Sequence, residues 1–210
     1  MGELLYIQAS PRGERSYSTR VADAFVSVYD ETHPDDTVRI LNVFEANLPS
    51  FDGPAVQAKY SILHGIDHTE QERLAWKTVE AVIQEFLSAD RYVISVPMWN
   101  FGIPYRLKQY IDLLVQPGYT FSFDPVKGYD GLVKNKAVLL ACARGGSYPP
   151  GSERALFDHQ IPYLKTVLSF IGLSDISLVV VEPTLAGGPD GAAAALDEAI
   201  KRARGLAAAF

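Results

Sequence analysis

Five short apolar runs alternate with longer amphipathic stretches, and this alternation constrains the fold of the chain more than any other feature. The runs are rich in β-branched residues: Leu4–Gln8, Val38–Val43, Tyr92–Val96, Ala137–Ala141 and Ile176–Val181. The last three are almost continuously apolar, as expected of strands that a parallel sheet buries on both faces. Strands that alternate with helices predict a parallel sheet with right-handed crossovers.

The stretches between the runs have apolar residues at helical spacing. Helices are expected over Ser18–Tyr29, Thr69–Ser88, Tyr105–Val115, Leu164–Ile171 and Ala192–Ala209. The second of these opens with a capping box, formed by Thr69 and Glu72. Five strands suit the doubly wound order 2-1-3-4-5 better than a six-stranded dinucleotide-binding sheet. We therefore predict one α/β domain over residues 1–210, with a long connection, Leu48–His68, of the kind that forms lids or interface segments.

Charge and cysteine content limit the partners and the compartment. The net charge of −6 argues against a nucleic-acid or anionic-membrane partner, because both need a basic patch. A single cysteine, Cys142, cannot form an intrachain disulfide, which favours a reducing compartment. No apolar run approaches the ~20 residues of a membrane span, and Met1–Gln8 lacks the pattern of a signal peptide. We expect a cytoplasmic protein with no membrane partner.

Ligands of open parallel sheets bind beyond the carboxyl ends of the strands, where the strand order reverses. In the order 2-1-3-4-5 this point lies between the first and third strands. The loop after the first strand brings the hydroxyls of Ser16 and Ser18 directly to a helix start, where free N–H groups favour an anion. Either serine serves equally well as a plain N-cap, and both interpretations stay open. The loop matches neither the P-loop nor the GxGxxG pattern.

The loops after the third and fourth strands are also unusual. Pro97–Pro104 brackets two aromatic residues, a thioether and an amide between prolines, and its stiff backbone can present polar groups to a flat ring. The alternative is a buried turn that plugs the core. Ala143–Tyr148 contains paired glycines, which allow close approach to a ligand or merely form a flexible turn. Together the three loops predict a site for a flat, phosphorylated, heteroaromatic cofactor.

Motifs spread over the whole chain carry a family resemblance. They are Ser10 with Ser16-Tyr17-Ser18, Pro97-Met98-Trp99-Asn100-Phe101, Gly118-Tyr119-Thr120-Phe121, Arg144-Gly145-Gly146 and Phe170-Ile171-Gly172. They resemble those of the FMN-dependent NADH:quinone oxidoreductases, also known as azoreductases, which have a flavodoxin-like fold. The resemblance implies one FMN per chain, NADH or NADPH as donor, and reduction of quinones and azo compounds by a ping-pong mechanism. It also implies a homodimer with two sites at the interface.

The resemblance also implies roles for particular residues. The ribityl chain and phosphate would be held by Ser10, Ser16, Tyr17 and Ser18. The isoalloxazine ring would be lined by Pro97, Met98, Trp99, Asn100 and Phe101. The pyrimidine end of the ring would be approached by Ala143, Arg144, Gly145 and Gly146. The substrate pocket would be walled by Tyr119, Phe121 and Phe170, for which ordinary core or interface packing is an equal alternative. The family often has a hydroxyl at position 143 and an amide at position 17.

Other chemistries find little support in the sequence. No nucleophile, dedicated base or metal ligand is assigned, since the four histidines lack metal-site spacing and no GxSxG elbow is present. Two alternatives of other classes stay open: a flavodoxin-like electron carrier without a substrate pocket, and a flavin-free phosphoesterase of the same fold. The mild acidity of the chain and its apolar Trp99/Phe101 loop favour the enzyme over the carrier.

Overall fold

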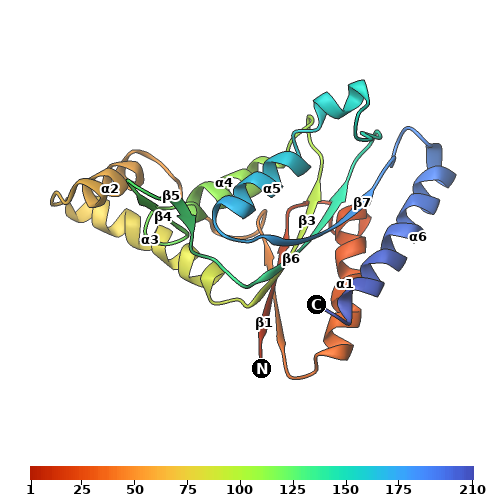
Figure 1. Ribbon diagram of the computed structural model, residues 1–210, viewed down its shortest axis with the longest axis horizontal. Coiled ribbons are helices and arrows are strands. Elements are labelled where there is room, and N and C mark those ends of the chain that lie inside the picture. Colours follow the sequence, from red (N-terminus) through yellow and green to blue (C-terminus); the bar gives the residue numbers. More distant parts are fainter.

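The predicted five-stranded sheet is present in the computed structural model, which describes residues 1–210 (Figure 1). Its strands are β1 (Glu3–Gln8), β2 (Thr37–Asn42), β3 (Arg91–Pro97), β6 (Ala137–Ala143) and β7 (Asp175–Val181). All neighbours pair in parallel in the order β2-β1-β3-β6-β7. Counting only the strands of this sheet, that is the predicted order 2-1-3-4-5.

The five predicted helices are also present, with ends within a few residues of those expected. They are α1 (Tyr17–Thr32), α3 (Glu70–Leu87), α4 (Tyr105–Leu114), α5 (Ile161–Phe170) and α6 (Gly188–Ala207). The capping box at Thr69 and Glu72 forms as predicted, with each side chain bonded to the backbone of the other residue. No α-helix of the chain combines the length and apolar character needed to cross a lipid bilayer.

The sheet separates two buried apolar cores, because successive side chains of a strand point to opposite faces. Leu4 and Tyr6 of β1 belong to the core shared with α1 and α6. Leu5 and Ile7 belong to the larger core shared with α3, α4 and α5. The helices therefore cover both faces, as Figure 1 shows, and leave the two ends of the sheet as places for a ligand.

One helix and one hairpin of two strands were not predicted. The expected connection Leu48–His68 contains a helix, α2 (Gly53–His64), and a two-stranded hairpin follows α4, made of β4 (Phe121–Asp124) and β5 (Gly128–Gly131). The buried positions of α2 carry only small side chains, Ala55, Ala58 and Ser61, so its hydrophobic pattern is weak. Together α2, the hairpin and the neighbouring part of α3 form a lobe at the left of Figure 1.

Candidate functional site

The loops after β1, β3 and β6 lie side by side at the carboxyl end of the sheet, because parallel pairing continues into them. The N–H of Ala9 donates to the carbonyl of Ser95 at 3.0 Å, and the N–H of Met98 donates to the carbonyl of Ala143 at 2.8 Å. These bonds join each loop to the next. The three loops that the sequence singled out therefore meet at the point where the strand order reverses.

Three serines and a threonine line the first loop with buried hydroxyls. Ser10, Ser16, Ser18 and Thr19 are all at most 4% exposed. Ser16 is the N-cap of α1, and its Oγ accepts the Thr19 N–H at 3.5 Å and lies 3.1 Å from the Oγ of Ser18. The hydroxyl of Thr19 is buried and has no partner in the chain. Buried hydroxyls without partners are uncommon, so this group is suited to a polar ligand at the helix N-terminus.

The second loop is a tight turn that projects Asn100 and Phe101. Trp99 and Gly102 exchange backbone hydrogen bonds of 3.1 and 2.9 Å, and the two residues between them have φ angles of 46° and 69°. Positive φ at both central positions strains residues other than glycine. The N–H groups of Asn100 and Phe101 donate to no other group of the chain. The turn thus exposes two donors and the ring of Phe101, which is 47% exposed.

The third loop also presents unpaired backbone donors. The carbonyl of Gly145 accepts from the N–H groups of Leu185 and Ala186, whereas the N–H groups of Gly145, Gly146 and Ser147 donate to nothing in the chain. A Cβ on Gly145 would lie 2.9 Å from the Leu185 side chain, so the loop packs closely on the segment after β7. Consecutive free N–H groups are a setting that favours electron-rich ligand atoms.

Two pockets flank the Pro97–Pro104 loop. One of about 290 Å³ lies toward the third loop and is lined by Phe101, Gly146, Ser147, Tyr148, Arg154 and Phe157. The other, of about 480 Å³, is lined by Trp99, Asn100, Gly102, Ile103, Tyr105, Lys108, His159 and Tyr163. The rings of Phe101 and Phe157 lie 5.4 Å apart. Flat aromatic surfaces beside free N–H groups suit a planar heteroaromatic ligand.

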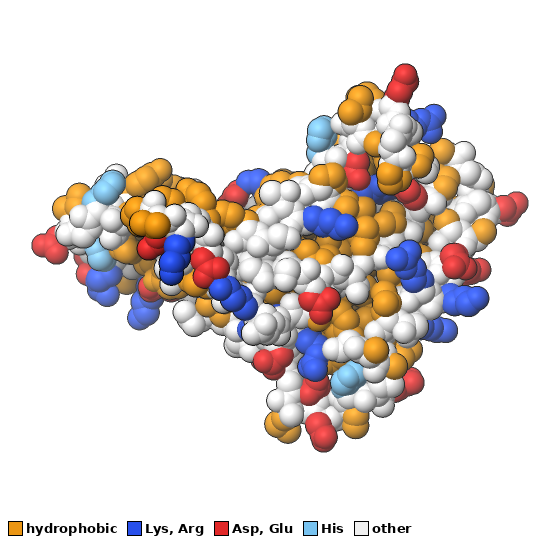
Figure 2. Space-filling view, in the orientation of Figure 1, with side chains coloured by type: hydrophobic (Ala, Val, Ile, Leu, Met, Phe, Trp, Pro, Cys, Tyr) orange, Lys and Arg blue, Asp and Glu red, His pale blue; other side chains and the backbone are white.

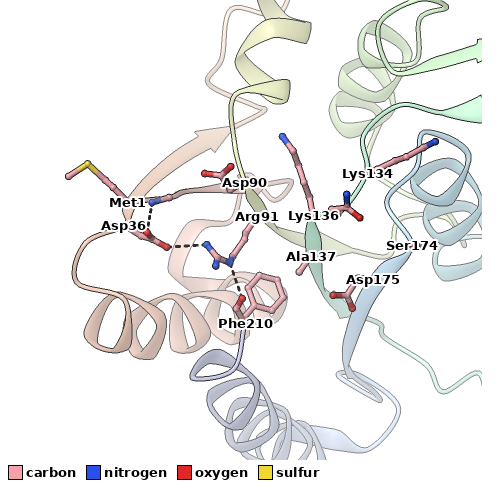
Figure 3. A pocket seen from close by; sticks show the side chains of 12 residues that line it. Met1, Asp36, Asp90, Arg91, Lys134, Lys136, Ala137, Ser174, Asp175 and Phe210 are labelled. Carbon is pink, nitrogen blue, oxygen red and sulfur yellow. Dashed lines mark hydrogen bonds and ion pairs between the residues drawn. The ribbon is translucent and has the colours of Figure 1, made fainter.

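A larger pocket of about 810 Å³ lies at the opposite, amino end of the sheet (Figure 3). Its cationic side chains are already bonded within the chain: Arg91 bonds to the carboxylate of Asp36 and to the carbonyl of Phe210, and Lys134 pairs with Asp130. Lys136 donates to the carbonyl of Leu87 at 2.8 Å and also to that of Ala89. Because these side chains are already engaged, the pocket offers a phosphate few free cations. The carboxyl end of the sheet is the better candidate.

The residues at the carboxyl end also fit FMN. The buried hydroxyls at the start of α1 suit a phosphate, and the first N–H groups of a helix lack acceptors within it. The second and third loops carry free N–H groups, and Phe101 and Gly146 line one pocket between these loops, where a flat ring with polar edges would be held. No group of three or more His, Cys, Asp or Glu side chains is arranged to hold a metal ion.

Comparison with known proteins gives the same assignment. Residues 2–206 match the family described as having a flavodoxin-like fold. The chain is 52% identical, over the full length of both proteins, to an FMN-dependent NADH:quinone oxidoreductase of Nitratidesulfovibrio vulgaris (strain DP4). The chain belongs to the FMN-dependent NADH:quinone oxidoreductase family. A second relative with that name, from Pseudomonas syringae pv. tomato, is 41% identical over 98% of each chain.

Solved structures of azoreductases are also similar to this one. An azoreductase from Bacillus anthracis (strain Sterne) superposes with a TM-score of 0.91 at 31% identity, with both chains covered completely. An FMN-dependent NADH-azoreductase of Bacillus anthracis (strain Ames Ancestor), solved in complex with FMN, has a TM-score of 0.86 at 28% identity and covers 99% of this chain. The resemblance that the sequence motifs suggested is therefore confirmed.

The expected cofactor residues of this family member lie together, whereas the expected substrate residues lie elsewhere. Phe121 and Phe170 pack with their rings 4.8 Å apart beside the hairpin, and Tyr129 joins them. Tyr119 packs against Trp76, and its hydroxyl donates to Glu80. None of the three predicted residues lines either pocket beside the Pro97–Pro104 loop. Within one chain, they form packing contacts of the lobe.

Several polar residues near this site were not singled out from the sequence. Thr19 follows the Ser16-Tyr17-Ser18 motif directly, and its position in the first helical turn was a usable signal. Asp158, Gln160 and Glu182 lie beneath the third loop, where they contact Arg144. Of these only Glu182 had a signal, since it follows the fifth strand of the sheet at the same carboxyl edge.

Proposed function

We propose that the chain binds FMN at the carboxyl end of its sheet and uses NADH to reduce quinones and aromatic azo compounds. Membership of the FMN-dependent NADH:quinone oxidoreductase family makes it an enzyme of this class. The observation that carries the proposal is the meeting of buried, partly unpartnered hydroxyls with five free backbone N–H groups at the strand-order reversal. These are the donors that a phosphorylated flavin requires.

Each loop has its own part in this arrangement. Ser16, Ser18 and the first turn of α1 bind the phosphate, with Ser10 and Tyr17 nearby for the ribityl chain. The turn at Met98–Phe101 holds the ring on one side. Ala143–Gly146 approaches its pyrimidine end, where the free N–H groups of Gly145 and Gly146 stabilise negative charge. Bound FMN supplies the electron-transfer chemistry, so the protein contributes binding, orientation and electrostatics.

The donor and the acceptor share one slot over the ring, which gives ping-pong kinetics. His159 lines one flanking pocket, but no carboxylate is hydrogen-bonded to its ring to orient it as a base. A planar nicotinamide and a planar quinone have similar shapes, and the aromatic walls at Phe101 and Phe157 accept either. Initial rates at varied acceptor should give parallel double-reciprocal lines. Intersecting lines for all acceptors would instead require a second binding site.

A second copy of the chain completes the site in this proposal. Phe121 and Phe170, with Tyr119 beside them, would wall the substrate pocket of a partner, since they lie away from the pockets of their own chain. The hairpin between them exposes apolar side chains: Phe123 is 60% and Tyr129 65% exposed. Figure 2 shows apolar side chains gathered on this lobe. We also place the protein in the cytoplasm, where a lone buried thiol such as Cys142 stays reduced.

The test of the proposed function is a cofactor and turnover measurement on the purified protein. We expect a yellow protein that releases one FMN per chain on denaturation and consumes NADH when menadione is added. An electron carrier would hold FMN without catalysing that turnover, and a phosphoesterase would be colourless and take up no FMN. Either outcome would contradict the proposal. Release of FAD in place of FMN would contradict the cofactor assignment.

A further inference from the structure

The side chain of Arg144 lies beneath the third loop and is almost completely buried. Its exposed fraction is 3%, and all three ends of the guanidinium are occupied. Nη2 lies 2.6 Å from the carboxylate of Asp158, Nε 3.0 Å from the amide oxygen of Gln160, and Nη1 3.3 Å from the carboxylate of Glu182. Each of its three nitrogens has an acceptor within the chain, and burial keeps the group away from a ligand. Its backbone is engaged as well, since the N–H donates to Val181 and the carbonyl accepts from Thr184, so Arg144 lies beneath the surface of the site.

The partners of Arg144 connect it to several segments around the third loop. Gln160, which is fully buried, donates to the carbonyl of Val96, the residue before the Pro97–Pro104 loop begins. Asp158 accepts the N–H groups of Gln160 and Ile161 and so holds the start of α5. Glu182 accepts the N–H of Tyr148 at 3.3 Å. One side chain thus joins the second loop, the third loop, α5 and the end of β7.

This network has a fixed shape and a net charge. A guanidinium is a planar fork with donors in set directions, whereas the ammonium of lysine is a compact point charge that cannot reach three separated acceptors in the same way. Buried ion pairs bring little net stability compared with apolar packing, so stability alone is a weak reason for this arrangement. One guanidinium and two carboxylates also leave one negative charge beneath Gly145 and Gly146.

We propose that Arg144 is a positioning residue that holds the free N–H groups of Gly145 and Gly146 at the flavin ring. Through Gln160 and Val96, it also keeps the third loop in register with the second. Asp158 and Glu182 are its anchors, and the negative charge they leave lowers the reduction potential of the bound flavin. This inference rests on the proposed function, because it assumes FMN at the carboxyl end of the sheet.

The first test replaces the guanidinium of Arg144 with an ammonium group and so keeps its positive charge. Arg144→Lys should weaken the binding of both FMN and riboflavin, each by roughly tenfold, because a displaced loop loses contacts with the ring and not with the phosphate. The FMN-to-riboflavin affinity ratio should stay as in the wild type. The midpoint potential of bound FMN should become more negative, since the N–H groups no longer stabilise the reduced ring. Affinity is measured by flavin fluorescence quenching, and potential by a xanthine oxidase–dye titration.

A matched control is Arg39→Lys. Arg39 also bonds to three residues, Glu3, Glu85 and Ser88. It lies on β2 on the side of α3, and its side chain is 30% exposed. This change should leave flavin affinity and potential unaltered. The comparison separates the effect of losing any arginine network from the effect of losing the network of Arg144. Both variants are compared at a temperature at which circular dichroism shows them folded.

The second test removes the negative charge of Glu182 and keeps the shape of its side chain. Glu182→Gln can still accept from Arg144 and from the N–H of Tyr148, but one negative charge beneath the loop is gone. The potential of bound FMN should therefore rise, opposite in sign to the change in Arg144→Lys, with FMN affinity within about threefold of the wild type. Because this variant leaves the guanidinium partnered, it tests the inference even if Arg144→Lys does not fold.

Distinct results would overturn the two parts of the argument. Wild-type protein that binds no FMN would refute the proposed function and this inference with it. Wild-type protein that binds FMN, together with an Arg144→Lys variant of unchanged flavin affinity and potential, would refute the positioning role alone. Loss of FMN binding without loss of riboflavin binding would also refute it, since that pattern belongs to the phosphate site. An unchanged or lowered potential in Glu182→Gln would refute the electrostatic part.

Discussion

The hydroxyl of Ser16 has two neighbours, the N–H of Thr19 and the hydroxyl of Ser18. As N-cap of α1 it accepts the Thr19 N–H, but at 3.5 Å this is a long bond, and the neighbouring Ser18 hydroxyl is equally buried. The cap interaction therefore forms at the same helix start where we propose the phosphate site. The sequence left these two interpretations open, and the structure confirms the cap without excluding the phosphate.

Removing these hydroxyls should affect FMN more than riboflavin. Ser18→Ala, which keeps the cap, should weaken FMN binding by roughly 10-fold to 100-fold, since a hydrogen bond to a charged group contributes ~1.5–3 kcal/mol. Riboflavin lacks the phosphate and should lose much less. Ser16→Ala should show the same pattern plus ~1 kcal/mol of lost stability from the cap. Flavin quenching titrations measure both ligands.

A control on the same helix is Ser27→Ala, at an exposed position of α1. It should change neither affinity. If both site variants keep the wild-type FMN-to-riboflavin ratio, the serines are only helix caps.

Cys142 should make the protein less stable above pH 9. Complete burial raises the pKa of this thiol from its ordinary 9.0 to about 12. The folded state then keeps its proton while the unfolded chain loses it, so stability is full below pH 9 and falls between pH 9 and 12. Near pH 9.5 the slope of unfolding free energy against pH should be about 1 kcal/mol per pH unit shallower in Cys142→Ala. This slope is measured by urea unfolding at pH 8.0, 9.0, 9.5 and 10.0, which is roughly the range in which the unfolded thiol ionises. Parallel curves would show that the thiol ionises equally in both states.

At the scale of elements, the hairpin is attached to the body by a contact between two glycines. A Cβ built on Gly131, at the end of β5, would lie 2.3 Å from the backbone nitrogen of Gly172, which has a φ of 108°. The N–H of Val133 then donates to the carbonyl of Ile171 at 2.8 Å. Backbone meets backbone here, so no flexible side chain can move to relieve the clash.

Gly131→Ala should therefore destabilise the protein by about 1–3 kcal/mol, because overpacking forces the backbone apart. Gly205→Ala is the control. Gly205 lies inside α6 with nothing near the added methyl, and the change should stabilise by about 0.5–1 kcal/mol. Chemical denaturation of both variants gives the comparison. A Gly131→Ala protein as stable as wild type would mean that the hairpin separates from α5 without cost.

At the scale of the whole molecule, several large apolar side chains of the lobe are exposed. Tyr60, Ile66 and Leu74 on and beside α2 and α3 are each more than half exposed, as are Phe123 and Tyr129 of the hairpin. Contiguous exposed apolar surface marks interaction sites, and most oligomers of one chain are two-fold symmetric. These side chains are the candidate interface of the proposed homodimer.

We expect light scattering to give the mass of a dimer for the wild type. Phe123→Asp combined with Tyr129→Asp should produce monomers that still bind FMN but reduce quinones poorly, if the partner walls the substrate pocket. Ile40→Asp, a charge placed at an exposed position of β2 outside the lobe, should leave the dimer intact. A wild-type monomer with full activity would contradict the proposal.

That residues 1–210 fold as one domain also stays a prediction. Both cores share the same sheet, so unfolding monitored by circular dichroism and by tryptophan fluorescence should give coincident transitions. Separate transitions would show that the lobe unfolds independently.

The sequence by itself determined the strands, most helices and the loops of the site, because apolar periodicity and turn chemistry are local properties. The strand order also followed, since right-handed crossovers in a five-strand pattern leave few arrangements. From that order came the site, as the carboxyl ends at a reversal are the only place where the loops after β1, β3 and β6 can meet.

Only the tertiary structure decided which side chains meet over long separations. Arg144 bonds to groups 14, 16 and 38 residues further along the chain, and no local pattern distinguishes such partners from solvated charges. The small buried residues of α2 gave no periodic signal, and Phe121 and Phe170 joined the lobe because α5 ends beside the hairpin. Free backbone N–H groups are likewise invisible in a sequence, since every residue but proline has one, and only the folded loop shows which remain unpaired.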